Sequence, residues 1–296
     1  MSDIFPNTTF NDTTLPLSSN QLIKNGLKCD GLVLGLEKID ERVLSKLKNL
    51  KFISKYGVGI DNIDLELCKK KNIKVLYTKG VNSDSVTELA LSYIILLSRN
   101  ALTANNLLKN KKIWKKNGGM QMNELTIGII GFGRIGQFTA KYALGLGMNV
   151  KAFDPFMKKA VIDIEIAHQK IQVPIETCSM NELLTTSDFI SLHVPMPEDG
   201  KPVLGTAEFE AMKNGVRIVN AARGGVVDEG ALINAINSNK VSFAALDVFV
   251  GEPNPSTEIL NNENISLTPH IGAATGEAQD RIGIELADKI INFYNQ

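Results

Sequence analysis

One segment near the middle of the chain restricts the possible folds more than any other. An apolar run, Leu125 to Ile130, leads directly into Gly131-Phe132-Gly133-Arg134-Ile135-Gly136, and a helical pattern then continues to Gly145. A strand, a glycine-rich turn and a helix in this order form the arrangement that binds the pyrophosphate of a dinucleotide. We expect Gly131 to form the tight turn, Gly133 to leave room for the phosphates, and Gly136 to let the helix approach the sheet.

An acidic residue, Asp154, ends the next expected strand, eighteen residues after Gly136. Its carboxylate would accept hydrogen bonds from the adenosine ribose and repel a 2′-phosphate, which favours NAD over NADP. Lys158 and Lys159 follow closely and keep NADP open as an alternative. The helix start, including Arg134 and Ile135, would offer N–H groups to the phosphates. A glycine-rich turn without a ligand is the other interpretation, which the strand, the helix and the acid together disfavour.

Short apolar runs alternate with longer helical patterns along the chain. Because the runs are apolar throughout, they are typical of strands in a parallel sheet covered on both faces. The predicted class is therefore α/β, with a doubly wound Rossmann-type sheet. The expected strands are Gly31 to Leu36, Phe52 to Ser54, Lys74 to Tyr77, Leu125 to Ile130, Val150 to Phe153, Phe189 to His193, Arg217 to Asn220 and Phe243 to Asp247.

The length of 296 residues favours two domains, because a single core seldom grows that large. With the glycine turn near the centre, sequence on both sides has to build the second domain. We expect a cofactor domain over residues 96–270 and a second domain formed by 1–95 and 271–296. A long helical pattern from Val86 to Leu108, with Ser85 and Glu88 placed as a capping box, is the predicted crossing between them.

Charge and cysteine content exclude several classes of protein. Lys plus Arg equals Asp plus Glu at 32 each, so no overall positive field would hold a nucleic acid or an anionic membrane. The longest apolar stretch, Leu89 to Leu97, is too short to span a bilayer, and the N-terminus does not resemble a signal peptide. Cys29, Cys68 and Cys178 fit neither a disulfide framework nor a metal site, so we expect a reducing cytoplasm and no metal.

Three late segments add specific motifs: Asn220 to Glu229, Asp247 to Pro253 and Thr268 to Ala273. With the upstream glycine turn, they make the chain resemble the D-isomer-specific 2-hydroxyacid dehydrogenases from about Asn20 onward. The resemblance implies hydride transfer between NAD and the C2 atom of a D-2-hydroxy acid, a smaller flavodoxin-like substrate domain, and a homodimer. The segments Ser54 to Asp64 and Gly80 to Glu88 are most similar to the branch that oxidises 3-phosphoglycerate.

The resemblance implies that Arg223, Glu252 and His270 are the catalytic residues. A guanidinium fork matches a planar carboxylate, so Arg223 would bind the substrate carboxylate and carbonyl. Imidazole serves as acid and base near neutral pH, so His270 would exchange the proton. Glu252 would orient His270 and stabilise its imidazolium form. A surface ion pair for Arg223 and a merely buried imidazole for His270 are the alternatives.

The same resemblance assigns further residues to the cofactor wall. His193, Val194 and Pro195 match a strand end that contacts the cofactor, as does Ala222. Asp247 matches a position near the nicotinamide carboxamide, although it could also cap the end of its strand. His168 has no motif around it and is expected on the surface.

Substrate contacts are expected from the first third of the chain. Backbone N–H groups around Val58 and Gly59 would form an anion site. The family's phosphoglycerate enzymes carry a cation where Lys55 stands, and Asn82 with Ser83 would help to bind a phosphate. A solvated surface lysine is the alternative for Lys55. The preferred substrate pair is 3-phosphoglycerate and 3-phosphohydroxypyruvate, with hydroxypyruvate or glyoxylate second.

The chain departs from the family pattern at both ends. No first strand and helix of the substrate domain are evident before Gly31, where we see only polar sequence with apolar patches at Ile4-Phe5 and Leu15 to Leu17. The expected substrate domain is therefore reduced, with an exposed sheet edge, and no regulatory domain is expected after Gln296. An L-lactate-type dehydrogenase is disfavoured because its glycine turn lies near the N-terminus. A non-catalytic NADH-sensing scaffold remains as a second class.

Overall fold

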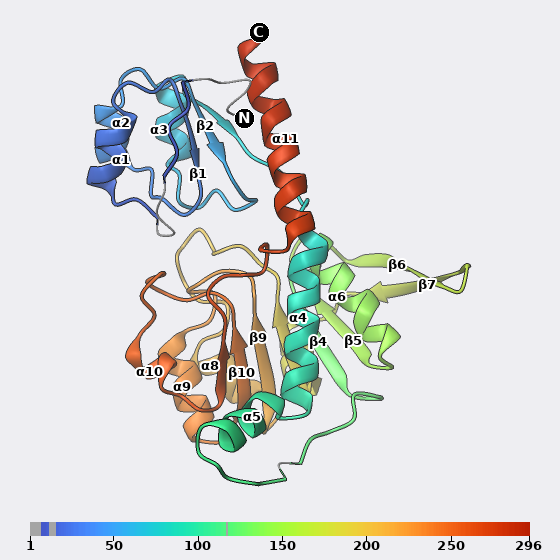
Figure 1. Cartoon of the computed structure of the whole chain (residues 1–296). Coiled ribbons are helices and arrows are strands. Elements are labelled where there is room, and N and C mark those ends of the chain that lie inside the picture. Colours follow the sequence, from blue (N-terminus) through green and yellow to red (C-terminus); the bar gives the residue numbers. More distant parts are fainter. Residues whose placement is uncertain (1–6, 12–15, 117) are drawn as a thin grey trace. The chain divides into compact units, whose positions relative to one another are not determined.

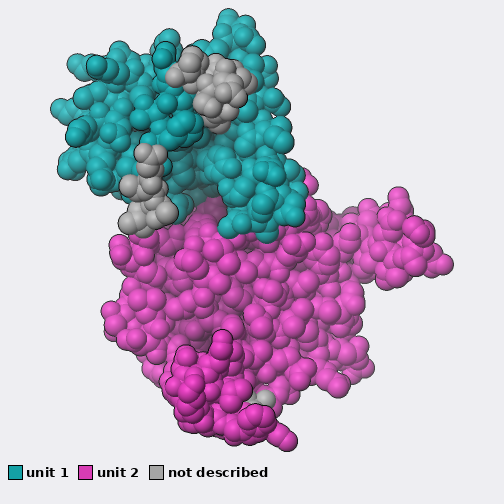
Figure 2. All heavy atoms as spheres, in the orientation of Figure 1, with its two compact units in different colours: residues 1–82, 273–296 teal, residues 83–272 magenta. Residues whose placement is uncertain are grey.

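The computed structural model describes residues 7–11, 16–116 and 118–296. The chain forms two compact units, residues 1–82 with 273–296 and residues 83–272, coloured separately in Figure 2. The first border lies earlier than the expected 95/96, and the second lies two residues after the expected 270/271. The helix around Tyr93, Ile94 and Leu97 belongs to the larger unit because these side chains are part of its core.

The smaller unit is built on a three-stranded parallel sheet in the order β1-β2-β3. Buried side chains of α1 to α3 pack with Leu34 and Ile53 on one face. On the other face, Phe52 and Leu76 pack against Ile290 of α11. The elements are β1 (Gly31–Leu34), β2 (Phe52–Lys55), β3 (Lys74–Leu76), α1 (Ser19–Gly26), α2 (Glu41–Lys46), α3 (Leu65–Lys70) and α11 (Gly276–Tyr294).

Before β1, the structure contains a helix that was not expected, and the described residues contain no additional strand, as expected. A helix does precede β1: α1 begins after Ser18, whose hydroxyl and the Gln21 side chain form a reciprocal capping box. Sequence reasoning missed it because the helix has only eight residues and is mostly polar. No strand precedes β1 in residues 7–11 and 16–30. Ile4, Phe5 and Leu15 lie outside the described residues.

The larger unit contains a six-stranded parallel sheet in the order β11-β10-β9-β8-β4-β5. The chain enters at β4, adds β5 on one side and β8 on the other, so the strand order reverses at β4. Its strands are β4 (Thr126–Ile130), β5 (Asn149–Phe153), β8 (Phe189–Leu192), β9 (Val216–Asn220), β10 (Val241–Leu246) and β11 (Ile265–Leu267). The parallel α/β class predicted from the apolar runs is confirmed.

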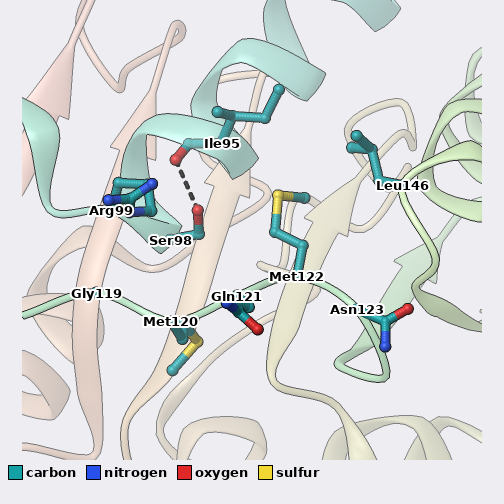
Figure 3. Close-up of a pocket in the computed structure, with 9 residues that line it drawn as sticks. All are labelled: Ile95, Ser98, Arg99, Gly119, Met120, Gln121, Met122, Asn123 and Leu146. Atoms are coloured by element: carbon teal, nitrogen blue, oxygen red, sulfur yellow. Dashed lines mark hydrogen bonds between the residues drawn. The ribbon is translucent and has the colours of Figure 1, made fainter.

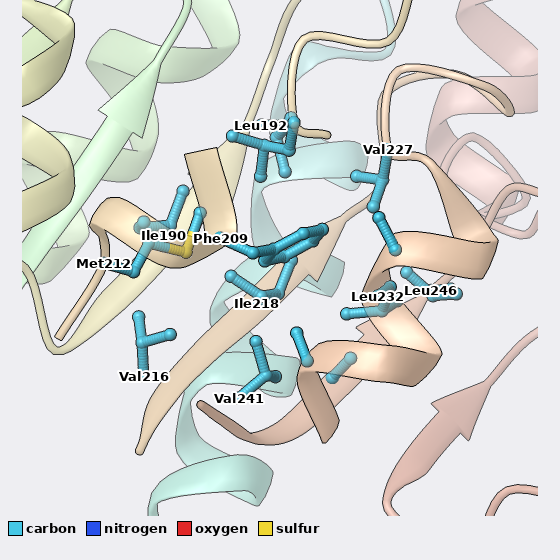
Figure 4. Close-up of a cluster of buried hydrophobic side chains, with 14 of the residues drawn as sticks. Ile190, Leu192, Phe209, Met212, Val216, Ile218, Val227, Leu232, Val241 and Leu246 are labelled. Atoms are coloured by element: carbon cyan, nitrogen blue, oxygen red, sulfur yellow. The ribbon is translucent and has the colours of Figure 1, made fainter. Parts of the chain in front are cut away.

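Successive residues of each central strand enter two different cores, as Ile218 and Val219 of β9 do. Helices α7 to α9 cover one face, where Phe209, Leu232 and Leu246 pack together (Figure 4). Helices α4 and α6 cover the other (Figure 1). The helices of this unit are α4 (Ser83–Ser98), α5 (Ala101–Lys109), α6 (Arg134–Gly145), α7 (Met180–Thr186), α8 (Thr206–Ala211), α9 (Glu229–Asn237) and α10 (Thr257–Leu260).

The helix expected from Val86 to Leu108 is interrupted. It forms α4 and α5, separated at Asn100, whose φ of 50° is left-handed backbone that ends a helix. The predicted capping box is also wrong, because α4 begins at Ser83 and Ser85 lies inside it, donating from its hydroxyl to the Gly272 carbonyl oxygen at 2.6 Å.

An antiparallel hairpin, β6 (Lys159–Ile166) and β7 (Gln169–Glu176), was not predicted. It extends away from β5 and α6 (Figure 1). Its isoleucines alternate with polar residues, which is a strand signal. The two turn residues are Ala167 and His168, both with positive φ, instead of the Asn-Gly or Asp-Gly that usually marks such a turn. His168 is exposed there, as expected.

No helix among residues 7–11, 16–116 and 118–296 is both long and apolar enough to cross a membrane.

Candidate active site

The predicted catalytic and cofactor residues of the larger unit share one location in the fold. Each follows the carboxyl end of a strand of the six-stranded sheet: Gly131 after β4, Asp154 after β5, His193 after β8, Arg223 after β9, Asp247 and Glu252 after β10, and His270 after β11. Parallel strands place these ends along a single edge. Ligands of doubly wound sheets bind at this edge, where the strand order reverses.

The glycine turn connects β4 to α6 in the way the sequence predicts. Gly131 has a φ of +91°, and a Cβ atom on Gly136 would lie 2.1 Å from the Gly131 carbonyl oxygen. Gly133 is the N-cap of α6, with no side chain capping the helix and nothing within 4 Å of its Cβ position. The uncapped N–H groups and the open space above Gly133 fit the pyrophosphate of NAD.

Asp154 holds the glycine turn from the neighbouring strand. One carboxylate oxygen accepts from the backbone N–H of Phe132 at 2.8 Å, and the other accepts from Phe156 and Met157 at 2.9 and 3.1 Å. Because a carboxylate has about four acceptor sites, this residue retains capacity for a ribose hydroxyl. The role in ribose binding remains a proposal.

His193 lies against the glycine turn. Its carbonyl oxygen would be 2.5 Å from a Cβ on Gly131, and a methyl carbon of Val194 would be 2.7 Å away. The ring Nε2 lies 2.9 Å from the Ser191 hydroxyl, and burial lowers the pKa of His193 to about 4. The imidazole is therefore neutral at neutral pH, which suits a wall and not a proton carrier; its contact with the cofactor stays a prediction. Pro195 is exposed at the end of this segment.

His270 and Glu252 form the pair expected of an acid and its orienting carboxylate. The imidazole Nδ1 lies 2.8 Å from Glu252 Oε2, and both side chains are partly exposed, by 35% and 22%. The other Glu252 oxygen accepts from the Phe249 N–H at 2.7 Å. The pKa of Glu252 is lowered: burial alone would raise it, but the hydrogen bonds from His270 and Phe249 and the charges of His270 and Arg223 outweigh burial.

Arg223 lies on the adjacent turn. A Cβ on Gly224 would come within 1.9 Å of the Phe249 carbonyl oxygen, so the missing side chain lets this turn lie against the one that leads to Glu252. The Arg223 guanidinium donates to the Ala222 carbonyl oxygen at 2.7 Å. The turn is closed by Asn220, whose amide donates to the Arg223 carbonyl oxygen and accepts from the Ala222 N–H, both at 3.0 Å. Sequence reasoning gave Asn220 no such role.

Asp247 is 1% exposed and fully engaged in the loop that carries His270. Its carboxylate accepts from the Thr268 hydroxyl and from the backbone N–H groups of Ile271 and Gly272, the latter two at 2.8 Å. The structure therefore gives it a role in fixing that loop, close to the capping alternative. A contact with the nicotinamide remains a proposal.

The expected substrate residues lie mostly in the smaller unit. Lys55 is 5% exposed and donates from its ammonium group to the Gly35 carbonyl oxygen, so the solvated alternative is wrong. Val58 and Gly59 are half-buried in the loop after β2. Asn82 ends the unit, and its Oδ1 atom is buried without a hydrogen-bond partner among the described residues. Ser83 begins α4 in the larger unit.

A cavity of about 540 Å³ lies elsewhere in the larger unit, between the end of α4 and the segment from Gly119 to Asn123 (Figure 3). No predicted site residue lines it, and Arg99 is the one charged side chain among its lining residues. It therefore offers no acid or base for the reaction.

Comparison with known proteins agrees with this geometry. Residues 91–272 match the profile of the D-isomer specific 2-hydroxyacid dehydrogenase, NAD binding domain. A hydroxypyruvate reductase of Thermotoga maritima is 42% identical over 285 residues, 94% of this chain and 89% of the relative. A D-3-phosphoglycerate dehydrogenase of Archaeoglobus fulgidus is 39% identical over 280 residues, 93% of this chain but 51% of the relative.

Among solved structures, D-lactate dehydrogenase from Aquifex aeolicus, complexed with NAD and lactic acid, has a TM-score of 0.81 at 28% identity, covering 99% of this chain and 91% of that one. The chain belongs to the D-isomer-specific 2-hydroxyacid dehydrogenase family. It is an NAD-dependent oxidoreductase with a Rossmann cofactor unit. It spans about half the length of the phosphoglycerate dehydrogenase relatives.

Proposed function

We propose that this enzyme reduces a small 2-keto acid to the D-2-hydroxy acid, with hydroxypyruvate as the preferred substrate, and catalyses the reverse oxidation. The observation that carries the reaction is the His270–Glu252 contact at 2.8 Å beside Arg223, on the sheet edge that holds the glycine turn. Bound NADH supplies the hydride. Arg223 would bind the substrate carboxylate through two charge-assisted hydrogen bonds.

His270 would donate its proton to the carbonyl oxygen as negative charge develops there. A protonated imidazole beside the Glu252 carboxylate is stabilised by the opposite charge. After the proton has left, the neutral ring retains the Nδ1 hydrogen bond to Glu252, so the ring keeps its orientation. In the oxidation direction Nε2, the ring nitrogen that does not face Glu252, would accept the hydroxyl proton.

The choice of substrate rests on Lys55. The sequence favoured 3-phosphohydroxypyruvate because a cation stands at position 55, but this ammonium is buried against the Gly35 carbonyl oxygen. The hydroxypyruvate reductase relative is also similar over nearly its whole length. The phosphorylated substrate is the second candidate, supported by the phosphoglycerate dehydrogenase relatives.

Steady-state kinetics with hydroxypyruvate, glyoxylate, pyruvate and 3-phosphohydroxypyruvate, each with NADH and NADPH, tests the proposal. We expect kcat/KM for hydroxypyruvate with NADH to exceed that of the phosphorylated acid at least about tenfold, or 1.4 kcal/mol. A reversed ratio would assign the enzyme to phosphoglycerate. No turnover with any of the four acids would leave the non-catalytic NADH-sensing scaffold as the better description.

Lys55→Ala separates the two substrates further. If Lys55 bound a phosphate, kcat/KM would fall for the phosphorylated acid alone. Asn62→Ala is the matched control, because the Asn62 amide also donates to the Gly35 carbonyl oxygen, at 3.1 Å, without carrying charge. We expect both variants to affect all four acids alike.

We further propose that two copies of the chain pair through α5 and the segment after it. Leu102, Leu108 and Ile113 are 39–48% exposed and Trp114 is 81% exposed, which is a large apolar surface for a solvated helix end. Sedimentation should show that the parent protein is a dimer and that Trp114→Ser dissociates more readily. A monomeric parent would contradict the proposal.

The three free cysteines support a reducing cytoplasm as the location of the protein.

A further inference from the structure

The loop from Thr268 to Gly272 carries His270 and is fixed by buried side chains on its inner side. We propose that Tyr93, acting through Thr268 and Asp247, is a positioning residue for His270. The inference rests on the proposed role of His270 as the proton donor. It adds a residue of α4, 177 positions earlier in the sequence, to the machinery of proton transfer.

Asp247 is the centre of this arrangement. Its carboxylate binds Thr268, Ile271 and Gly272, and its backbone carbonyl oxygen accepts from the His270 N–H at 2.9 Å. Four of the five residues of the loop are thus tied to one residue at the end of β10. Any shift of Asp247 or Thr268 would be passed to the backbone of His270.

Tyr93 completes the chain of hydrogen bonds. Its hydroxyl contacts the Thr268 hydroxyl, and the Thr268 hydroxyl contacts Asp247. An ionised carboxylate only accepts, so Thr268 must give its single hydroxyl hydrogen to Asp247. The Thr268 oxygen is then an acceptor, and Tyr93 is the donor.

The side chain of Tyr93 is suited to that role. It is 2% exposed. Its pKa is raised to about 12: burial raises it most, the hydrogen bond with Thr268 offsets part of that rise, and the charge of Asp247 adds to it. The phenol therefore keeps its proton across the working pH range, and the direction of the chain from Tyr93 to Asp247 is constant.

His270 needs such support because its backbone is strained. Its φ of 54° lies in the left-handed region, which is unfavourable for a residue other than glycine and persists only where the surroundings hold it. The strained conformation presents the ring Nδ1 to Glu252 at 2.8 Å. The ring is thus held at one end by Glu252 and at its backbone by the Asp247 network, and loosening the network would misalign the proton donor.

Tyr93→Phe removes only the donor and tests the proposal. We expect kcat to fall about tenfold, with KM and the Kd for NADH changed less than twofold. The solvent isotope effect on kcat should rise, because proton transfer from a misaligned His270 becomes slower. Thr268→Val should lower kcat further, since it leaves Asp247 without the hydroxyl, and Thr268→Ser should restore most of it.

Two variants control for a purely structural effect. Tyr142→Phe removes the phenol of a half-buried tyrosine on α6, and Thr87→Val removes a fully buried hydroxyl of α4 that donates to the Ser83 carbonyl oxygen. Neither should change the isotope effect. An unchanged kcat and isotope effect in Tyr93→Phe would overturn the proposal. A loss matched by Thr87→Val in kcat, KM and thermal midpoint would also overturn it.

A readout without turnover separates this proposal from the proposed function. The chain has three histidines, so the imidazole NMR signals of His270 are readily assigned with the aid of His168→Gln and His193→Gln. We expect Tyr93→Phe to shift the His270 signals, and Tyr142→Phe to leave them in place. Unmoved His270 signals would reject the positioning role, whether or not the enzyme reduces any of the four acids.

Discussion

The glycine turn and the His270 loop lie on the same edge of one sheet, but they are shaped in opposite ways. The glycine turn is defined by side chains that are missing, since a Cβ on Gly136 would meet the Gly131 carbonyl oxygen at 2.1 Å. The His270 loop is defined by side chains that are present and buried, with Asp247 holding four of its residues.

This difference decides which of the two regions can be predicted from a sequence motif. A turn made by glycines is encoded within six consecutive residues and leaves a fixed spacing. A loop held by buried hydrogen bonds depends on partners such as Tyr93 and Thr268, which are 175 positions apart. Changes in the two regions should therefore have different consequences.

His270→Gln should lower turnover by about 10²–10⁴-fold, the usual contribution of a positioned acid or base. The Kd for NADH should stay within about twofold, because the glycine turn is untouched. Steady-state kinetics and fluorescence titration with NADH measure the two quantities. If His270→Gln retained full turnover, or lost NADH affinity in parallel, the two regions would not have the separate roles proposed for them.

The buried imidazole of His193 should couple the free energy of unfolding to pH. The pKa of His193 in the folded chain is lowered to about 4, below its unfolded value near 6.5. Between these values the unfolded chain binds the extra proton, so stability present above pH 6.5 is lost as the pH falls toward 4. The loss is about 3 kcal/mol in the free energy of unfolding.

Urea unfolding at several pH values measures this term, which His193→Gln should remove. His168→Gln, in the exposed hairpin turn, is the control and should keep the slope of the parent. If the free energy of unfolding of His193→Gln depended on pH as that of the parent protein does, His193 would not be the titrating group.

Arg223→Ala should cost about 1.5–3 kcal/mol in transition-state binding, as expected for hydrogen bonds to a charged partner. That corresponds to a fall in kcat/KM of about 10- to 150-fold, with NADH affinity little changed. Arg223→Lys should recover only part of the loss, because an ammonium group lacks the two parallel donors. An unaltered kcat/KM in Arg223→Ala would disprove the role in substrate binding.

Gly136→Ala should strain the glycine turn by about 1–3 kcal/mol, the usual cost of overpacking, because the new Cβ displaces the Gly131 carbonyl oxygen, and should thereby weaken NADH binding. The kcat at saturating NADH should fall less than in His270→Gln. Gly145→Ala, on the same helix with nothing within 4 Å of its Cβ position, is the matched control. Equal NADH affinities in the two variants would contradict the close approach at Gly136.

The sequence predicted eight strands of the two parallel sheets to within about two residues, because short apolar runs mark their positions. It did not predict β11 or the β6–β7 hairpin, whose turn has no glycine. The break at Asn100 was also missed, since a left-handed asparagine leaves the apolar pattern on either side intact.

The site shows the same limits. Motifs located Arg223, Glu252 and His270, and the structure brings these three side chains to adjacent turns. Motifs did not reveal that Asn220 closes the Arg223 turn or that Tyr93 reaches Thr268, because hydrogen-bond partners far apart in the chain leave no spacing to read. The burial of Lys55 was equally invisible, since a lysine is most often solvated.

The parallel sheet of the larger unit has a second edge, where the strands begin. The turns that enter β9 and β10 lie there and contain Gly215 and Asn239, with φ of 80° and 58°. None of the residues assigned to chemistry belongs to these turns. Substitutions in these turns, beginning with Asn239→Gly, could therefore raise thermal stability without changing the turnover or the substrate selectivity of the enzyme.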